Sequence, residues 1–197
     1  LNNGSWQWAK RAGGGTGNDY GTGIAVDSSG NSYVTGYFDG SSADFGNTTL
    51  SSSGSQDVFV AKLDSSGNWL WAERAGGANN DRGYGIAVDS SGNAYPTGIF
   101  QGSSADFGNT TLSSLGSYEV FVAKLDSSGT WLWAERAGGS DTDQGYGIAV
   151  DSSGNAYATG NFQGSSADFG STTLSSSGNE DIFVAKLDSS GNWLWAK

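Results

Sequence analysis

Short apolar and aromatic runs alternate along the chain with clusters of Gly, Ser, Asn and Asp. β-branched and aromatic runs of this length between turn residues are typical of β-strands. An Asp-Ser-Ser-Gly turn joins the first run of residues 78–139 to the second, and the third to the fourth. Asp caps such a turn and Gly takes the positive φ that closes it, so each pair is predicted to be an antiparallel hairpin. The four predicted strands are Tyr84–Val88, Ala94–Phe100, Val120–Leu125 and Trp131–Ala137.

The apolar positions within these strands indicate how the sheet is buried. The first and third strands are nearly continuous in apolar residues, which a sheet covered on both faces requires. The fourth alternates, with Trp131 and Trp133 on one face and Leu132 on the other. Pro96 lies in the second strand and has no N–H, so we expect a bulge there or a position outside the ladder. The connection 101–118 is expected to hold a short extended piece.

The pattern recurs at an interval of 62 residues, since Ile24, Ile86 and Ile148 begin the same phrase and 86 − 24 and 148 − 86 are both 62. A four-stranded antiparallel sheet that repeats and stacks on its neighbours is a β-propeller blade. The sequence therefore predicts an all-β fold of three propeller-type blades. The predicted blades are residues 15–77, 78–139 and 140–197.

One segment, Trp-x-Trp-Ala, occurs four times where the others occur three times. Its four copies contain all eight tryptophans of the chain. The first copy falls in residues 1–14, which we predict to form a surplus outer strand, a partial repeat.

Charge and composition restrict the class of partner. The formal charge is −11 with nine Lys and Arg residues, so the chain lacks the basic clusters that bind nucleic acid or anionic membranes. Its apolar runs are far shorter than the roughly 18 residues needed to span a bilayer, so no membrane insertion is expected. The acidic, Ser/Thr/Gly-rich and cysteine-free composition fits an extracellular or cell-surface protein.

The residue types that most often perform catalysis are absent. No His, Cys or Met occurs, which removes the commonest general base, the commonest metal ligand and the thiol nucleophile. Aspartates recur in equivalent positions, but successive blades would hold them apart, whereas a glycosidase pair must flank one bond. We therefore predict that the chain is not an enzyme and has no catalytic, cofactor-binding or metal-binding residue. The recurrent aspartates are Asp19, Asp81, Asp143, Asp44, Asp106 and Asp168.

Two ligands stay open as alternatives to purely structural roles. Ca²⁺ is the alternative ligand of the recurrent aspartates, although the Asp-Ser-Ser-Gly turns lack the alternating acidic ligands of calcium loops and are better interpreted as hairpins. Glycans are the alternative partner of the tryptophans, which we interpret first as packing residues at the outer edge of each blade.

Several motifs recur in the same order in each unit. In the middle unit they are Gly85–Tyr95, Thr97–Gly98, Val120–Asp126, Gly129 and Leu132–Trp133. With this combination the chain resembles the seven-bladed β-propeller repeats of bacterial and archaeal secreted and surface proteins, over essentially its whole length, although it has three units. The resemblance implies a first strand near the propeller axis, an outermost fourth strand and no catalytic residue.

The number of blades suggests how chains associate. Three blades leave an apolar face open at each end, more than a soluble monomer usually exposes. Our leading hypothesis is a structural protein that self-associates through terminal strands and open blade faces into a filament or array, because a heterologous contact that does not close makes a filament. The predicted interface residues are Trp6, Trp8, Trp193 and Trp195.

Two other interpretations fit the same repeats. One is a carbohydrate-binding, lectin-like or adhesive propeller module. The other is a designed or excised repeat fragment whose copies close into a multi-chain ring, where two copies would give 2 × 3 = 6 blades and leave one tryptophan strand per chain unused.

Overall fold

The computed structural model describes residues 4–197, which form three four-stranded antiparallel sheets and contain no helix long and apolar enough to cross a bilayer. The predicted all-β class and the three repeats are confirmed. Blade 1 consists of β1 (Asp19–Val26), β2 (Ser32–Asp39), β5 (Gln56–Leu63) and β6 (Trp69–Ala75). Blade 2 consists of β7 (Arg82–Val88), β8 (Ala94–Phe100), β11 (Glu119–Leu125) and β12 (Trp131–Ala137). Blade 3 consists of β13 (Gln144–Val150), β14 (Ala156–Phe162), β17 (Asp181–Leu187) and β18 (Trp193–Ala196).

The predicted strands of the middle unit agree closely with the structure. The second and fourth have the predicted bounds, while β7 begins two residues earlier, at Arg82, and β11 one residue earlier, at Glu119. Both extensions are paired in the sheet, because Arg82 lies opposite Ile99 and Glu119 lies opposite Phe100. Polar residues at these strand ends hid the extensions from the apolar pattern.

A two-stranded hairpin follows the second strand of every blade, where the sequence predicted a short extended piece. Each strand of these hairpins has three residues, and the turn between them holds a Gly at positive φ, such as Gly108 at 70°. The hairpins are β3 (Ala43–Phe45) with β4 (Thr48–Leu50), β9 (Ala105–Phe107) with β10 (Thr110–Leu112), and β15 (Ala167–Phe169) with β16 (Thr172–Leu174).

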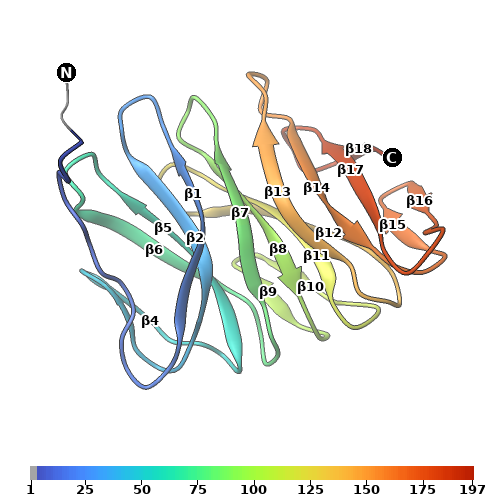
Figure 1. Cartoon of the computed structure of the whole chain (residues 1–197), viewed down its shortest axis with the longest axis horizontal. Coiled ribbons are helices and arrows are strands. Elements are labelled where there is room, and N and C mark those ends of the chain that lie inside the picture. The colour runs from blue at the N-terminus through green and yellow to red at the C-terminus, as the bar shows by residue number, and fades with distance from the viewer. Residues whose placement is uncertain (1–3) are drawn as a thin grey trace.

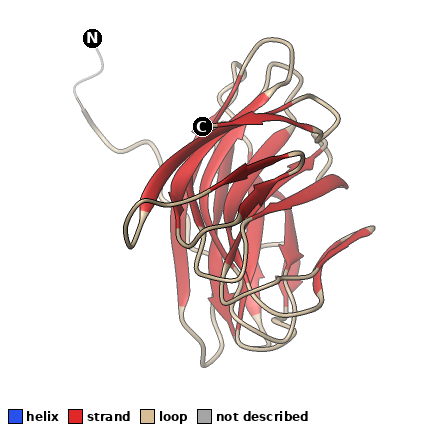
Figure 2. Ribbon diagram, turned by 90° about the vertical axis from the view of Figure 1, so that its right-hand side faces the viewer, coloured by secondary structure: helices blue, strands red, loops and turns tan. Residues whose placement is uncertain are grey.

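The three blades stack face to face along the chain (Figure 1), and the first strands β1, β7 and β13 lie side by side. The apolar core lies between the blades. Val58 and Val60 of blade 1 belong to one buried cluster with Ile86 and Leu125 of blade 2. A second cluster joins blades 2 and 3. Seen along the stack, the strands of successive blades overlap in projection (Figure 2), which is how each blade covers its neighbour.

The Asp-Ser-Ser-Gly segments are tight hairpin turns, as predicted. In the first turn, Asp27 Oδ1 accepts hydrogen bonds from the backbone N–H groups of Ser29 and Asn31, at 2.9 and 3.0 Å. Gly30 has φ 80°, a conformation that glycine adopts without a Cβ penalty. The Asn31 side-chain amide, which donates to Asp27 Oδ2 over 2.8 Å, and these backbone hydrogen bonds favour the carboxylate and hold the pKa of Asp27 below its ordinary value, against the opposing effect of burial.

Pro96 lies inside β8, opposite Ile86 of β7. On its other side, the pairing of β8 with β11 is present at Thr97 and again at Ala94 but skips Tyr95 and Pro96. In blade 3 the pairing is continuous through Ala158, the equivalent of Pro96. The missing N–H therefore leaves a local gap in the pairing of β8 with β11, and β8 continues past that gap.

Candidate interaction surfaces at the two end blades

At the inner junctions, a tryptophan of one blade packs on a glycine turn of the next. Trp71 lies so close to Gly129 that a methyl group there would be 3.0 Å from Trp71 Cδ2. The Trp71 Nε1 donates to the Ser127 carbonyl over 3.1 Å. Trp133 repeats the contact on Gly191, with a corresponding distance of 2.9 Å. The tryptophans at these positions are packing residues, as the sequence favoured.

Buried phenols add a second contact to each inner junction. The Tyr33 hydroxyl donates to the Gly92 carbonyl of blade 2 over 3.1 Å. The Tyr95 hydroxyl donates its shorter hydrogen bond, over 3.0 Å, to Asp89 Oδ2 of its own blade, and lies 3.4 Å from the Gly154 carbonyl of blade 3. Both rings are fully buried, so each hydrogen bond satisfies a polar group that packing has removed from water.

Backbone pairing is the third contact between blades. Gly76, after β6, exchanges two backbone hydrogen bonds with Asp106 of blade 2, at 2.9 and 3.0 Å. Gly138, after β12, does the same with Asp168 of blade 3. The recurrent aspartates of the hairpins therefore join neighbouring blades through their main chain.

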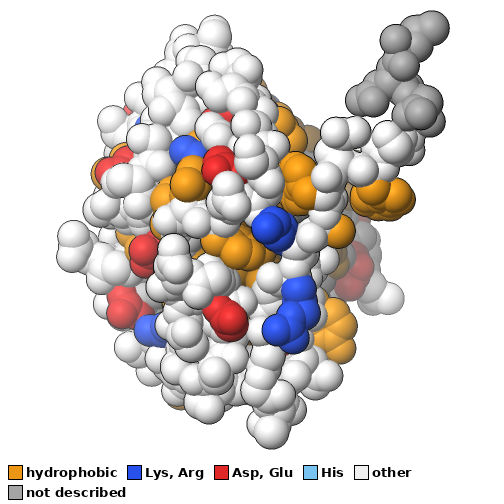
Figure 3. All heavy atoms as spheres, turned by 90° about the vertical axis from the view of Figure 1, so that its left-hand side faces the viewer, with side chains coloured by type: hydrophobic (Ala, Val, Ile, Leu, Met, Phe, Trp, Pro, Cys, Tyr) orange, Lys and Arg blue, Asp and Glu red, His pale blue; other side chains and the backbone are white. Residues whose placement is uncertain are grey.

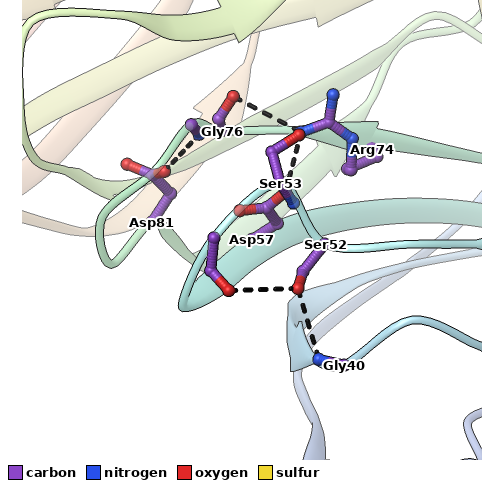
Figure 4. A network of polar contacts seen from close by, with 9 residues as sticks. Gly40, Ser52, Ser53, Asp57, Arg74, Gly76 and Asp81 are labelled. Carbon is purple, nitrogen blue, oxygen red and sulfur yellow. Dashed lines mark hydrogen bonds and ion pairs between the residues drawn. The ribbon is translucent and has the colours of Figure 1, made fainter.

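A buried carboxylate network lies beside this pairing (Figure 4). Asp57 is fully buried and its Oδ2 is 2.7 Å from Arg74 Nη1. Asp81 is also fully buried, and its two oxygens accept backbone hydrogen bonds from Gly77, at 2.7 Å, and Gln101, at 3.0 Å. Its counterpart between blades 2 and 3 consists of Glu119, Arg136, Asp143, Gly139 and Gln163.

Burial dominates the electrostatics of this network. Burial, with a smaller contribution from the nearby Asp57, raises the pKa of Asp81 to about 6 against the opposing effect of backbone N–H groups and Arg74. Burial also raises the pKa of Asp57, and the pKa of Asp143 is raised by burial and by Glu119. Asp57 Oδ1 has no hydrogen-bond partner within the described residues. These carboxylates hold hydrogen bonds and ion pairs at the junction, but burial makes their ionised form less stable than it would be in water.

The described part of the predicted surplus strand, residues 4–14, contains no strand; residues 1–3 of that prediction lie outside the described residues. A strand needs a hydrogen-bonded neighbour, and within the described chain this segment pairs at a single bridge, between Gly13 and Asp44. That bridge is the same contact that Gly76 makes with Asp106.

Trp8 nevertheless occupies the place of an outer-strand tryptophan. Its Nε1 donates to the Ser65 carbonyl over 3.2 Å. A methyl group on Gly67 would lie 2.8 Å from Trp8 Cδ2, as close as at the inner junctions. The segment thus lies against blade 1 where the fourth strand of a preceding blade would lie.

The outer face of blade 1 is apolar and hollow. Ile24 of β1 is 67% exposed, whereas its equivalent Ile86 is 8% exposed. Figure 3 shows several groups of hydrophobic side chains on this face, with charged side chains among them. A cavity of about 290 Å³ opens there. Its apolar lining includes Trp8, Ile24, Val34, Phe59, Leu63 and Trp69.

The outer face of blade 3 carries uncovered β-branched residues. Ile182 of β17 is 81% exposed, while its equivalents Val58 and Val120 are fully buried by the next blade. Val184 is 43% exposed, and its equivalent Val122 is fully buried. Sequence reasoning missed this pair because its apolar pattern is the same in all three units. Aligning the units on the 62-residue interval could have found it, because the alignment shows that Ile182 and Val184 have no following blade to cover them.

The four tryptophans predicted for the interface lie at opposite ends of the stack. Trp6, at 92% exposed, and Trp8 lie at blade 1. Trp193 packs against Phe169 in blade 3, with ring centroids 5.4 Å apart, and Trp195 packs against Tyr157 at 6.3 Å. One chain therefore does not bring the four together.

The recurrent aspartates likewise do not converge on one site. Within residues 4–197, no group of three or more His, Cys, Asp or Glu side chains is arranged to hold a metal ion. The predicted absence of catalytic, cofactor-binding and metal-binding residues stays a prediction, as does the Ca²⁺ alternative.

Comparisons with known proteins agree with this architecture. The family described as "Beta-propeller repeat" matches residues 7–41, 70–98 and 132–161. Each match begins in a tryptophan segment and reaches the second strand of the blade that follows. The family repeat therefore straddles the blade junction, and its first match includes the segment that carries Trp8.

Two curated proteins are similar over part of the chain. A WD repeat-containing protein of Acanthamoeba polyphaga mimivirus is 30% identical over 115 residues, which cover 55% of this chain and 8% of that protein. The regulatory protein FlaEY of Caulobacter vibrioides is 30% identical over 150 residues, which cover 71% of this chain and 15% of that protein. The chain thus spans a small fraction of either relative. The three repeat matches and the three stacked four-stranded sheets show that the chain contains β-propeller repeats.

Proposed function

We propose that this chain is a non-enzymatic structural and interaction protein, extracellular or on a cell surface, that self-associates head to tail. Blade 3 of one copy stacks on blade 1 of the next, as blade 1 stacks on blade 2 within the chain. A heterologous contact of this kind adds three blades with each copy and builds a filament or array unless the ring closes.

The observation that carries the proposal is the exposure of Ile182. A β-branched side chain that is 81% exposed on a central strand of a sheet is unusual, and its two equivalents are fully buried. Burying a large aliphatic side chain contributes about 1.5 to 3 kcal/mol. Burying the exposed parts of Ile182 (81%) and Val184 (43%) would therefore contribute about 2 to 4 kcal/mol to a junction that covers them.

The opposite face has the matching shape. On blade 2, Val58 and Val60 of the preceding blade pack in one cluster with Ile86, Phe121 and Leu125. The equivalents of the last three on blade 1 are Ile24, Phe59 and Leu63, and all three line the open cavity. The cavity is therefore the empty counterpart of a contact that the chain makes elsewhere, and Ile182 and Val184 are the equivalents of the side chains that fill it.

A pair of variants tests the proposal. Ile182→Asp places a charge on the proposed interface, and we expect it to abolish association. Leu115→Asp is the matched control, because Leu115 is 61% exposed in a loop of blade 2 and its equivalents are Ser53 and Ser177. Light scattering and negative-stain images report molar mass and particle shape. Equal association of the wild-type chain and Ile182→Asp would overturn the proposal.

Glycan binding is the second candidate function, and the exposure of Trp6 favours it. An exposed indole offers a flat platform on which a sugar can stack. Quenching of tryptophan fluorescence by a glycan, lost in Trp6→Ala and retained in Trp193→Ala, would support this candidate. No quenching across a glycan array would dismiss it.

A further inference from the structure

The outer ladder of blade 3 stops short of the ladders in blades 1 and 2. In blade 2, Phe121 lies opposite Arg136 and Val120 lies opposite Ala137. In blade 3, Val184 exchanges backbone hydrogen bonds with Lys197, at 3.0 and 2.9 Å. Beyond that point the described residues supply no outer partner to Phe183 and Ile182, the equivalents of Phe121 and Val120.

A carboxylate beside this gap also lacks the partner that its equivalents have. Asp57 pairs with Arg74 at 2.7 Å, and Glu119 pairs with Arg136 at 2.7 Å. Asp181 occupies the same position in blade 3 and accepts a hydrogen bond from the Ser177 N–H at 2.7 Å. Among the described residues it makes no ion pair.

The chain carries a matching segment at its other end. Arg11 is the equivalent of Arg74 in the first tryptophan segment, is exposed, and makes no ion pair within the described residues. The residues after it are already placed against blade 1. Gly13 exchanges backbone hydrogen bonds with Asp44, and the Gly14 N–H donates to Asp19 Oδ2 over 2.9 Å.

We propose that residues 11–14 of one copy continue β18 of a second copy. Arg11 would lie opposite Phe183 with its guanidinium on the Asp181 carboxylate, and Ala12 would lie opposite Ile182. This inference deepens the proposed function and rests on it, since it names the backbone and charge contacts of the same junction. The opposite charges of Arg11 and Asp181, neither of which has an ion-pair partner among residues 4–197 of one copy, are complementary across the junction.

If β18 of the second copy ends at residue 197 and residue 11 of the first copy continues the same strand, the position of Trp8 in the first copy is affected. By the same equivalence, Trp195 of the second copy would pack on Gly67, where Trp8 now lies. Trp8 is held there by its contact with Gly67 and one hydrogen bond to Ser65. Trp195 belongs to a strand paired with β17. Residues 4–10 would therefore leave this place when copies join.

A charge exchange tests the ion pair. We expect Arg11→Asp to weaken association about 10- to 100-fold, as loss of a partly buried charge pair does. Asp181→Arg should weaken it similarly, and the double exchange in one chain should restore most of the loss. Arg82→Asp is a control that changes the same charge away from the proposed pair. An unchanged association constant in Arg11→Asp would overturn the inference.

Disulfide trapping tests the strand register without relying on Asp181, whose loop contact could perturb folding. The chain has no cysteine, so single cysteines report cleanly. Chains carrying Ala12→Cys are mixed with chains carrying Ile182→Cys and oxidised, and we expect a mixed dimer that neither chain forms alone. Val120→Cys with Ala137→Cys is the positive control, because these residues face each other in one blade and paired strands hold their Cα atoms about 5.5 Å apart.

The outcomes separate this inference from the proposed function. Association that Ile182→Asp abolishes, with no mixed disulfide and no effect of Arg11→Asp, would retain the stacked faces and overturn the continuation of β18 by residues 11–14. A wild-type chain that stays monomeric at every concentration would overturn both.

Discussion

Trp8 covers Gly67 with its indole ring about as closely as Trp71 covers Gly129. The first of these contacts is made by a segment without a sheet, and the second by a full outer strand. The position of the tryptophan is thus set by the blade that receives it, through a glycine turn and a carbonyl acceptor. The glycine turn and the carbonyl acceptor of each blade therefore form a socket for the tryptophan that precedes that blade.

Replacing the glycine of this socket should lower the free energy of unfolding, and by more where the added methyl group also meets the tryptophan ring. Gly129→Ala meets both a positive φ of 94° and the Trp71 ring, so we expect it to lower the free energy of unfolding by about 2 to 4 kcal/mol. Gly30→Ala meets a positive φ of 80° but no atom closer than 3.4 Å, and should cost about 1 to 2 kcal/mol. Urea denaturation measures both, and equal losses would show that the ring contact contributes nothing.

Removing residues 1–10 should strengthen association. These residues include Trp8, which occupies the place proposed for Trp195 of the next copy, and they exclude Arg11. We expect the association constant to rise about tenfold, because the site no longer has to be vacated before binding. Analytical ultracentrifugation of the shortened and full chains gives the comparison.

A longer truncation provides the control for that experiment. Removing residues 1–14 also removes the segment proposed to complete blade 3, so association should fall below that of the full chain. If the two truncations behave alike, the segment that begins at Arg11 has no part in the junction.

Stability should increase as the pH falls from about 7 to about 5. The pKa of Asp81 is raised to about 6 by burial, and those of Asp57 and Asp143 are also raised. A raised pKa means that the folded chain binds more protons than the unfolded chain between the two pKa values, so the free energy of unfolding falls as the pH rises through that window. Over the whole window between the unfolded and folded pKa values of Asp81, the free energy of unfolding changes on the order of 2 to 3 kcal/mol.

Below about pH 4 the sign reverses. The turn aspartates, such as Asp27 and Asp89, have lowered pKa values in the folded chain, so their contribution is lost when acid protonates them. Thermal melts of the wild-type chain and of Asp81→Asn between about pH 2 and pH 7 test both statements. Asp81→Asn should flatten the rise between pH 7 and pH 5, and an unchanged profile would assign the rise to other groups.

Local pattern predicted most of the blade and little of its surroundings. Ala94–Phe100 and Trp131–Ala137 were predicted with their observed bounds, because apolar runs and turn residues delimit them on both sides. The hairpin of β9 and β10 was missed as a hairpin, because three-residue strands are too short to show a period. It is fixed instead by the pairing of Asp106 with the preceding blade.

The burial of side chains at the junctions could not be predicted from local pattern, because it depends on which blade packs against which. Asp81 was predicted to have a structural role, and its sequence does not reveal that it is fully buried beside Asp57. Ile182 is followed by the same Phe-Val-Ala-Lys-Leu run as Val120, and its exposure follows from its place at the end of the stack. The tryptophans drew attention to the ends of the chain, whereas Arg11 and Asp181 became visible only when equivalent contacts were compared.

The molar mass of the unmodified 197-residue chain as a function of concentration tests the central claim most directly. Static light scattering at about neutral pH is the measurement, with a single chain at 20.2 kDa as the reference. Head-to-tail association predicts a weight-average mass that climbs well above 20.2 kDa as concentration increases. A mass that stays at 20.2 kDa up to the solubility limit would contradict the account, because both apolar end faces would then remain open in water.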